Sequence, residues 1–197
     1  MTPGLFGVEI ELPLVWSAPE APSILREKRT YRFASRQGVR LIECESVLTA
    51  TEDVTFGDTK EGSFALRVRP ELRLKGDVAT GSMLNSTGQT DGDCWGKRAA
   101  WVSYESPLNG HQVGVTVMDH AQNLRHPTWW HARDYGLVAA NPFGTRAFEG
   151  KDSPSGKFLL EKGKSLTQKY LVVLSGSDDS RSIPVGELEN LWAWWTR

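Results

Sequence analysis

The sequence predicts an all-β protein, an antiparallel β-sandwich that ends in one short α-helix. Three observations predict this class. Apolar and polar residues alternate along much of the 197-residue chain, as they do in strands with one buried face. The pair Asn109-Gly110 separates two such runs and is typical of a hairpin turn. Turn residues divide the other runs at the spacing of a sandwich or barrel.

The first half of the chain contains a lead-in and three expected strands. Residues 1–23 are expected to be irregular, because prolines interrupt them at positions 3, 13, 19 and 22. Residues 24–197 are expected to form a single β-sandwich domain with the terminal helix. Within the first strands, every second side chain belongs to one face: Tyr31 and Phe33, then Ile42, Cys44, Ser46 and Leu48, then Phe64, Leu66 and Val68.

The second half continues the pattern on both sides of Asn109-Gly110. Ala100, Val102 and Tyr104 alternate before the turn, and residues 111–117 alternate after it. Further strands are expected over residues 135–140, 157–160 and 165–174. The helix should follow Pro184, because the apolar residues there recur at helical spacing: Leu188, Leu191, Trp192 and Trp195.

Charge and hydropathy exclude two classes of protein. The chain has 23 Lys and Arg against 24 Asp and Glu, a net charge of −1, so no strong field attracts nucleic acid. No apolar run approaches the roughly 20 residues that span a bilayer, so the chain is expected to be soluble and not bound to a membrane. It shows no signal peptide, and its compartment stays open. Cys44 and Cys94 are expected to be isolated buried thiols.

Unusual side chains gather between residues 119 and 144. Motifs for nucleotides and for the common hydrolases are absent, but the chain has eight Trp. Trp129 or Trp130 could offer a flat face to a pyranose ring, with Arg133 and a histidine binding its oxygens. In the alternative, one of these Trp covers the core while Arg133 forms a surface ion pair.

The histidines of this segment allow a second hypothesis, a metal site. His120, His126 and His131 have spacings of six and five, which fit no standard zinc pattern. Histidines in folded domains more often serve as hydrogen-bonded side chains. We assign no metal, and the cofactor stays unknown.

Two other segments add candidate residues. Glu61 lies in a polar, glycine-containing stretch before an expected strand, and a carboxylate opposite a histidine is the minimum pair for moving a proton. We expect Glu61 to act with His126 or His131, although a solvated turn would give the same pattern. Farther on, Lys97 lies beside Trp95, either to bind ligand oxygens or in a contact between a cation and an aromatic ring.

Three segments, taken in order, resemble one family. They are VTFGDTKEGSF at 54–64, WGK at 95–97, and residues 125–144 with RHPTWWH, DYGL and NPFG. The chain resembles the bacterial domain-of-unknown-function family labelled "methane oxygenase PmoA", here called the PmoA-like family, over about residues 25–175. The resemblance implies that the N-terminal part of that family, with its His-His-Arg segment, is missing here and that relatives are often exported. A weaker similarity implies a partial galactose-mutarotase-like supersandwich.

These observations lead to one expected function and two alternatives. We expect the chain to bind a carbohydrate or sugar-derived carbonyl compound and to process it by acid–base chemistry. A non-catalytic module that binds polysaccharide or protein through the same aromatic patch is the first alternative. The PmoA-like label implies a metal-dependent oxygenase, which we do not expect because no copper site is recognisable. The expected site residues are Glu61, His126 and His131 for catalysis, and Trp95, Lys97, Trp129, Trp130 and Arg133 for binding.

Overall fold

A computed structural model describes residues 6–36, 38–177 and 183–197. Its strands pair antiparallel throughout and a helix follows them near the C-terminus, so the expected all-β class is confirmed. Among the described helices, none has the length and apolar character needed to cross a membrane. The strands are β1 (Val8–Trp16), β2 (Leu25–Arg36), β3 (Val39–Ala50), β4 (Val54–Phe56), β5 (Phe64–Arg67), β6 (Ser82–Asn85), β7 (Trp101–Leu108), β8 (His111–Asp119), β9 (Trp129–Ala132), β10 (Leu137–Asn141), β11 (Phe158–Leu160) and β12 (Ser165–Ser177); the helices are α1 (Thr145–Glu149) and α2 (Val185–Trp195), with 3-10 turns η1 (Pro70–Leu72) and η2 (Asp91–Cys94).

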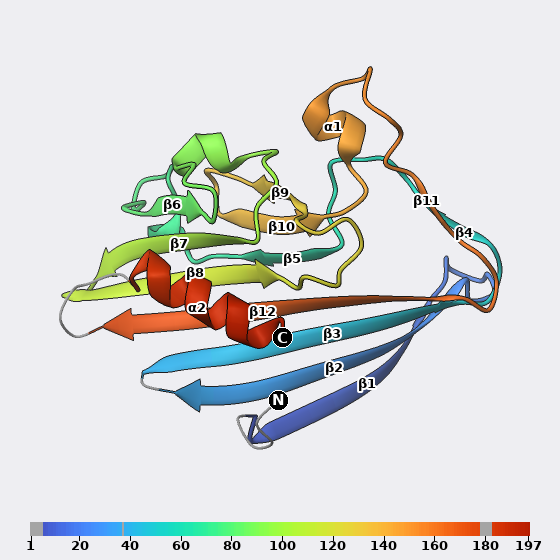
Figure 1. The fold of residues 1–197 in the computed structure, drawn as a ribbon, viewed down its shortest axis with the longest axis horizontal. Coiled ribbons are helices and arrows are strands. Elements are labelled where there is room, and N and C mark those ends of the chain that lie inside the picture. The colour runs from blue at the N-terminus through green and yellow to red at the C-terminus, as the bar shows by residue number, and fades with distance from the viewer. Residues whose placement is uncertain (1–5, 37, 178–182) are drawn as a thin grey trace.

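The strands form a large sheet, a small sheet and a ribbon (Figure 1). The large sheet has the order β1-β2-β3-β12-β8-β7-β6, the small sheet has the order β5-β10-β9, and β11 pairs with β4. β12 pairs antiparallel with β3 on one side and with β8 on the other, and Leu171 lies opposite Glu43 and Met118. The last long strand therefore joins the N-terminal strands to the central hairpin.

That central hairpin has the predicted two-residue turn. Leu108 pairs with His111, which leaves Asn109 and Gly110 as the loop between β7 and β8. Both loop residues have positive φ, 51° and 81°. This combination is the one that a type I′ turn requires, so the hairpin prediction is confirmed.

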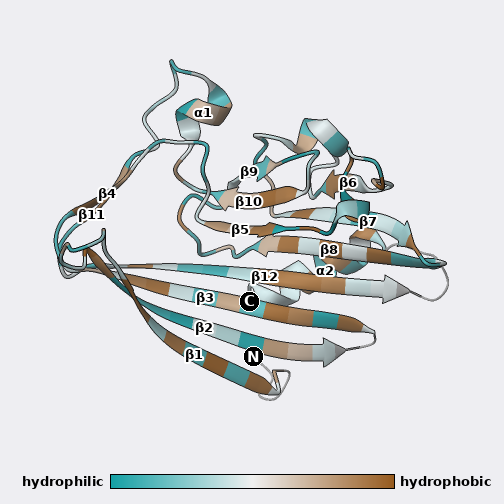
Figure 2. Cartoon of the chain, turned by 180° about the vertical axis from the view of Figure 1, so that it is seen from behind, coloured by the Kyte–Doolittle hydropathy of each residue, from teal (hydrophilic) through white to brown (hydrophobic). Residues whose placement is uncertain are grey.

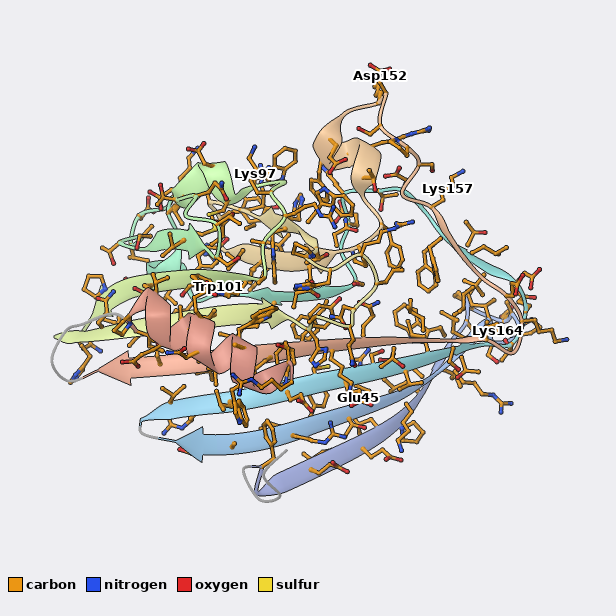
Figure 3. The ribbon with its side chains drawn as sticks, in the orientation of Figure 1. Glu45, Lys97, Trp101, Asp152, Lys157 and Lys164 are labelled. Carbon is orange, nitrogen blue, oxygen red and sulfur yellow. The ribbon has the colours of Figure 1, made fainter. Side chains whose placement is uncertain are left out.

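The large sheet packs on both faces. On one face, Tyr104 and Val117 of the large sheet contact Trp130 and Val138 of the small sheet. On the other face, a second apolar cluster joins the large sheet to α2. Figure 2 shows hydrophobic stretches along β5 and β10, and Figure 3 shows Trp101 beside α2. The fold therefore has three layers.

Three indole N–H groups tie α2 to the large sheet. Trp101 Nε1 donates to Glu189 Oε1 of the helix at 3.1 Å. Trp192 and Trp195 of the helix donate in the other direction, to the main-chain carbonyl of Asp119 at 2.9 Å and to Glu43 Oε2 at 2.6 Å. Buried Trp side chains need such partners, so these bonds fix both the position and the rotation of the helix predicted after Pro184.

The expectation of an irregular lead-in is wrong for residues 8–16, which form the edge strand β1. Pro13 lies within this strand, opposite Lys28 of β2. An edge strand uses only half of its backbone groups for pairing, so it tolerates a proline that a central strand would not. Ion pairs between Glu11 and Lys28, at 2.6 Å, and between Glu9 and Arg32, at 2.7 Å, support the same register. The short elements β4, β6, β9 and α1 were also missed, because three to five residues show no clear period.

Both cysteines are free and buried, as expected. Cys44 lies on β3 and Cys94 at the end of η2. Burial raises the pKa of Cys44 to about 11 and that of Cys94 to about 12. Each thiol therefore stays protonated at neutral pH and packs as a small apolar group.

Shortening a side chain between β12 and α2 should show how much this layer contributes. Leu171 is 0% exposed, whereas Leu159 on β11 is 53% exposed. We expect Leu171→Ala to lower the free energy of unfolding by about 3 kcal/mol, because it leaves a cavity in the core. Leu159→Ala, the matched control, should change it by less than about 0.5 kcal/mol. Urea denaturation measures both, and equal losses would contradict the packing described here.

Candidate functional site

β9 turns its side chains alternately to the core and to the outer face of the small sheet. Trp130 is 0% exposed, and its indole N–H donates to the carbonyl of Ala99 at 2.8 Å. It packs against the large sheet as a core residue. The expectation that Trp130 walls a ligand site is therefore wrong, because no face of its ring is accessible.

Trp129 belongs to the outer face but is also covered. The residue is 4% exposed, and the guanidinium carbon of Arg98 lies 4.5 Å from the ring centroid. Its indole N–H donates to Glu149 Oε1 of α1 at 2.9 Å. In this structure the contacts with Arg98 and α1 occupy the Trp129 ring, so it offers no free face to a sugar.

The outer face of the small sheet does bring four of the predicted residues together. We call Glu61, Trp95, His131, Arg133 and the neighbouring Phe148 the His131 cluster. Trp95 Nε1 donates to His131 Nδ1 at 3.3 Å, and the two rings meet edge to face. The guanidinium carbon of Arg133 lies 5.9 Å from the centroid of the Trp95 ring, and Phe148 of α1 packs on Trp95 at 5.5 Å. Glu61 is close enough for its charge to act on His131.

The hydrogen bond from Trp95 determines where the His131 proton lies. An indole N–H can only donate, so His131 Nδ1 must accept and the ring carries its proton on Nε2. Burial lowers the pKa of His131, the positive charges of Arg133 and Lys60 lower it further, and Glu61 opposes them. His131 is therefore a neutral imidazole at neutral pH that carries its proton on Nε2, and the residue is 5% exposed.

Close backbone contacts position the loop that carries Glu61. The backbone N–H of Ser63 donates to the carbonyl of Ala140 at 2.9 Å, and Asn141 Nδ2 donates to the carbonyl of Thr59 at 2.9 Å. A Cβ on Gly62 would lie 2.6 Å from the Ala140 carbonyl oxygen, so only glycine fits there. Residues 59–63 are thus fixed against β10, and Glu61 projects from them as an exposed side chain.

Lys97 lies on the segment that extends the small sheet beyond β9. Gly96 N–H donates to the Trp130 carbonyl at 2.8 Å, and Trp130 N–H donates to the Lys97 carbonyl at 3.0 Å. This pairing places Trp95 beside His131. The Lys97 side chain is exposed, and Figure 3 shows it on the outer side of β9.

His126 is not part of this cluster. Its Nδ1 is 2.7 Å from Asp119 Oδ2, and its ring stacks on Trp192 of α2 at 5.5 Å. α2 covers the opposite face of the large sheet from the small sheet that carries His131. Asp119 is fully buried and also accepts from Asn123 Nδ2 and from the backbone N–H of Thr128. Of the two histidines expected to act with Glu61, the structure therefore places only His131 near it.

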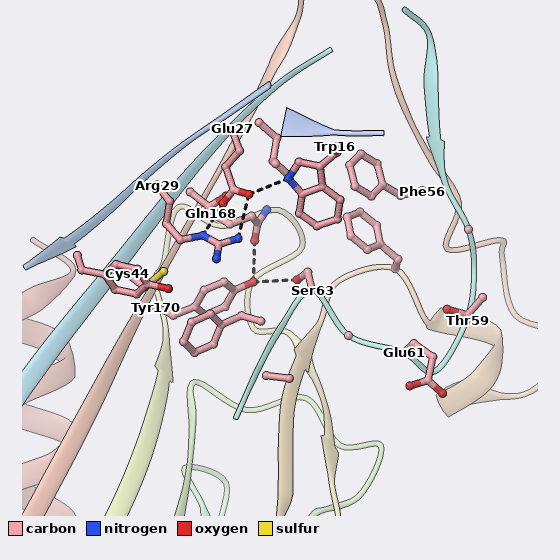
Figure 4. Close-up of a pocket in the computed structure, with 18 residues that line it drawn as sticks. Trp16, Glu27, Arg29, Cys44, Phe56, Thr59, Glu61, Ser63, Gln168 and Tyr170 are labelled. Carbon is pink, nitrogen blue, oxygen red and sulfur yellow. Dashed lines mark hydrogen bonds and ion pairs between the residues drawn. The ribbon is translucent and has the colours of Figure 1, made fainter. Parts of the chain in front are cut away.

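A cavity of about 410 Å³ lies on the same face of the large sheet as the small sheet, and sequence analysis did not find it. Strands β2, β3 and β12 form one wall, and residues 56–65 with Phe143 form the other. Figure 4 shows Glu27 and Arg29 paired on the sheet wall, with Tyr170 and Gln168 beside them. The residues that define it come from strands distant in sequence, so no local motif marks them.

Glu27 is the buried centre of the sheet wall. Its two oxygens accept from Arg29 Nε at 2.7 Å, Arg29 Nη2 at 2.9 Å, Ser46 Oγ at 2.7 Å and Trp16 Nε1 at 2.8 Å. Burial raises the pKa of Glu27, but the hydrogen bonds from Arg29, Ser46 and Trp16 outweigh burial and hold it below its ordinary value. Glu27 is therefore ionised, and Arg29 compensates its charge.

No metal-binding group is evident among the described residues: none of their His, Cys, Asp and Glu side chains form a set of three or more that could hold an ion. His120 packs edge to face on Trp195, His126 bonds to Asp119, and His131 bonds to Trp95. The three histidines considered for a shared metal thus have separate partners.

Removing the His126 side chain should destabilise the protein. Asp119 would lose its 2.7 Å partner in a buried setting, and Trp192 would lose its stacking contact. We expect His126→Ala to lower the free energy of unfolding by about 2 kcal/mol. Gln122→Ala, at an exposed position nearby, is the control and should have little effect. If urea denaturation gave the same free energy of unfolding for His126→Ala as for the wild type, this contact would not be stabilising the fold.

Protonation of His131 should also reduce stability. Its folded pKa is below the ordinary value of 6.5, so the unfolded chain binds this proton more readily. The resulting stabilisation is present above about pH 6.5 and is lost as the pH falls below it. We expect the free energy of unfolding to decrease more steeply toward about pH 5 in the wild type than in His131→Gln. Urea denaturation over a pH series tests this, and parallel curves would argue against a depressed pKa.

Two solved structures are similar to this chain at low identity. One is a provisionally assigned aldose 1-epimerase from Klebsiella pneumoniae, with 12% identity and a TM-score of 0.39 over 96% of this chain and 55% of that chain. The other is a galactose mutarotase related enzyme from Lactobacillus acidophilus, with 11% identity and a TM-score of 0.34 over 89% of this chain and 70% of that chain. This chain thus spans about half the length of the first. At these scores the likeness carries no argument about activity.

The sequence comparisons are more specific about the family. No curated protein matches the chain. A family model described as a family of unknown function, DUF6807, matches residues 2–188, which is nearly the whole sequence. The match does not bear on the PmoA-like label, so that resemblance stays a prediction. The chain belongs to the DUF6807 family.

Proposed function

We propose that this protein binds a carbohydrate, or a carbonyl compound derived from one, at the His131 cluster and moves a proton on it by acid–base chemistry. The observation that carries the proposal is the orientation of His131. The Trp95 N–H occupies Nδ1, so Nε2–H is the group left to donate to a ligand oxygen. A neutral histidine in this role polarises a carbonyl or hydroxyl oxygen without having to lose a charge first.

Glu61 would act as the proton acceptor, whereas His131 would act as the donor. It is exposed and close enough for its charge to act on His131, so it can accept a proton from a carbon or hydroxyl of the same ligand. Donation by His131 Nε2–H and acceptance by the Glu61 carboxylate together move a proton with no net change in charge. A carboxylate and a neutral imidazole are the minimum set for an isomerisation or elimination at a sugar carbon.

The other members of the cluster would bind and orient the ligand. Trp95 and Phe148 provide the aromatic surface that the sequence analysis assigned to Trp129 and Trp130. Arg133 is held between Trp95 and Tyr135, with its guanidinium carbon 5.9 and 5.5 Å from the two ring centroids. A guanidinium fixed in this way can donate paired hydrogen bonds to neighbouring oxygens of a sugar or its acid derivative.

Replacing Glu61 separates catalysis from binding. We expect Glu61→Gln to reduce turnover of the sugar substrate by about 10²- to 10⁴-fold, the usual contribution of general acid–base catalysis, while binding stays nearly intact. Turnover is followed by nuclear magnetic resonance of a panel of free sugars and sugar-derived ketones, and binding by calorimetry. Glu187→Gln, at an exposed position on α2, is the matched control and should leave both unchanged.

Two results would change the proposal. Equal turnover in Glu61→Gln and in the wild type would remove Glu61 from the chemistry. Binding without turnover of any compound in the panel would favour the alternative function, a non-catalytic carbohydrate-binding module. In that case His131→Gln should still weaken binding, because His131 would remain a ligand donor.

A further inference from the structure

We infer that the 410 Å³ cavity between the large sheet and residues 56–65 is a second binding site, for a neutral monosaccharide ring. Glu61 lines this cavity and also belongs to the His131 cluster, so the two sites meet at that residue. Figure 4 shows Glu61 at the far end of the cavity from Glu27 and Arg29, with its carboxylate turned away from them. The inference therefore does not rest on the acid–base function proposed above.

The first observation is a buried amide without a partner. Gln168 lines the cavity and is 4% exposed. Its Oε1 accepts from the Tyr170 hydroxyl at 3.0 Å, but among the described residues its Nε2 has no hydrogen-bond partner. Exchanging the two amide atoms would leave the oxygen unpaired in the same place. A buried polar atom without a partner is costly, so a ligand oxygen or hydroxyl at this position would stabilise it.

The second observation is that Glu27 and Arg29 on the sheet wall neutralise each other, while the third charged lining residue, Glu61, turns its carboxylate away from them. The Glu27 carboxylate is saturated by Arg29, Ser46 and Trp16, all within 2.9 Å. Arg29 is committed to the same pair. An ionic ligand would have to compete with this pair, whereas a neutral ligand would not. The Gln168 amide nitrogen remains to meet it, beside the Ser63 and Tyr170 hydroxyls that also line the cavity.

The third observation is the shape and chemistry of the remaining wall. Phe56 stacks on Phe143 at 4.7 Å, and Phe64 stacks on Tyr170 at 4.5 Å, so two pairs of parallel rings border the cavity. Trp16 closes its edge. Flat aromatic walls beside a few fixed polar groups suit a sugar ring, which has apolar C–H faces and hydroxyls around its edge. A purely aliphatic ligand would leave the Gln168 amide unpaired.

Titration of the whole chain with neutral sugars tests the inference. The probes are glucose, galactose, mannose and N-acetylglucosamine, with glucuronate as the charged comparison, and isothermal calorimetry measures affinity. We expect at least one neutral sugar to bind and Gln168→Met to weaken it by about tenfold or more, because the amide donor is lost. Gln122→Met, on an exposed turn, should leave this affinity unchanged.

Protein stability provides the control for folding. Gln168→Met removes the unpaired amide nitrogen and also the acceptor of the Tyr170 hydroxyl, which can donate to Ser63 Oγ at 3.3 Å instead, so the unfolding midpoint should change little. If that variant does not fold, Trp16→Leu replaces it, because Trp16 is 45% exposed on an edge strand and still lines the cavity. Trp16→Leu should lower the affinity for the same sugar.

Three outcomes would overturn the inference. One is that no neutral sugar in the panel binds, and another is that glucuronate binds more tightly than all of them. The third is binding that His131→Gln abolishes while Gln168→Met leaves it intact. That last result would assign the sugar to the His131 cluster alone, so it would support the proposed function and reject the second site. Loss of turnover in Glu61→Gln with unchanged sugar binding at the cavity would leave both proposals standing.

Discussion

The register of β12 is the constraint on which the other parts of the structure depend. This strand pairs with β3 and β8 at once and so joins the N-terminal and central strands into one sheet. Its side chains alternate between two environments: Gln168 and Tyr170 face the cavity and the small sheet, while Leu171 and Val173 face α2. A slip of one residue would exchange these two sets, so the cavity, the inner core and the helix layer are specified together.

The small sheet divides its two faces between stability and chemistry. Its inner face carries Trp130 and Val138 into the core, and its outer face carries His131. Because adjacent residues of β9 point in opposite directions, the buried Trp130 anchors the strand that orients its neighbour. The Trp95 hydrogen bond then fixes the ring. Orientation of His131 thus comes from packing on one side of the strand and from a single donor on the other.

Local patterns predicted the elements whose signals are contained in a few residues. Asn109-Gly110 defines its turn by backbone conformation alone, and the stripe of Leu188 and Trp195 defines α2. The same patterns could not tell which of Trp129 and Trp130 faces inward. Alternation assigns them to opposite faces of a strand, but which face is buried depends on the layer that packs against it. Glu27 and Gln168 could not be brought together either, since they share a wall only through the order of β2, β3 and β12. Pro13 led to the wrong expectation of an irregular segment. A strand tolerates proline at the edge of a sheet, and edge position depends on tertiary structure.

The two buried thiols have a practical consequence for experiments on this chain. The sequence contains only Cys44 and Cys94, and both are buried with pKa values raised to about 11 and about 12. Thiol-specific reagents react with the thiolate, which neither site forms to any extent near pH 7. A single cysteine introduced at the exposed Gln122 would therefore react first and allow a fluorophore or spin label to be attached at one chosen place without removing the native residues.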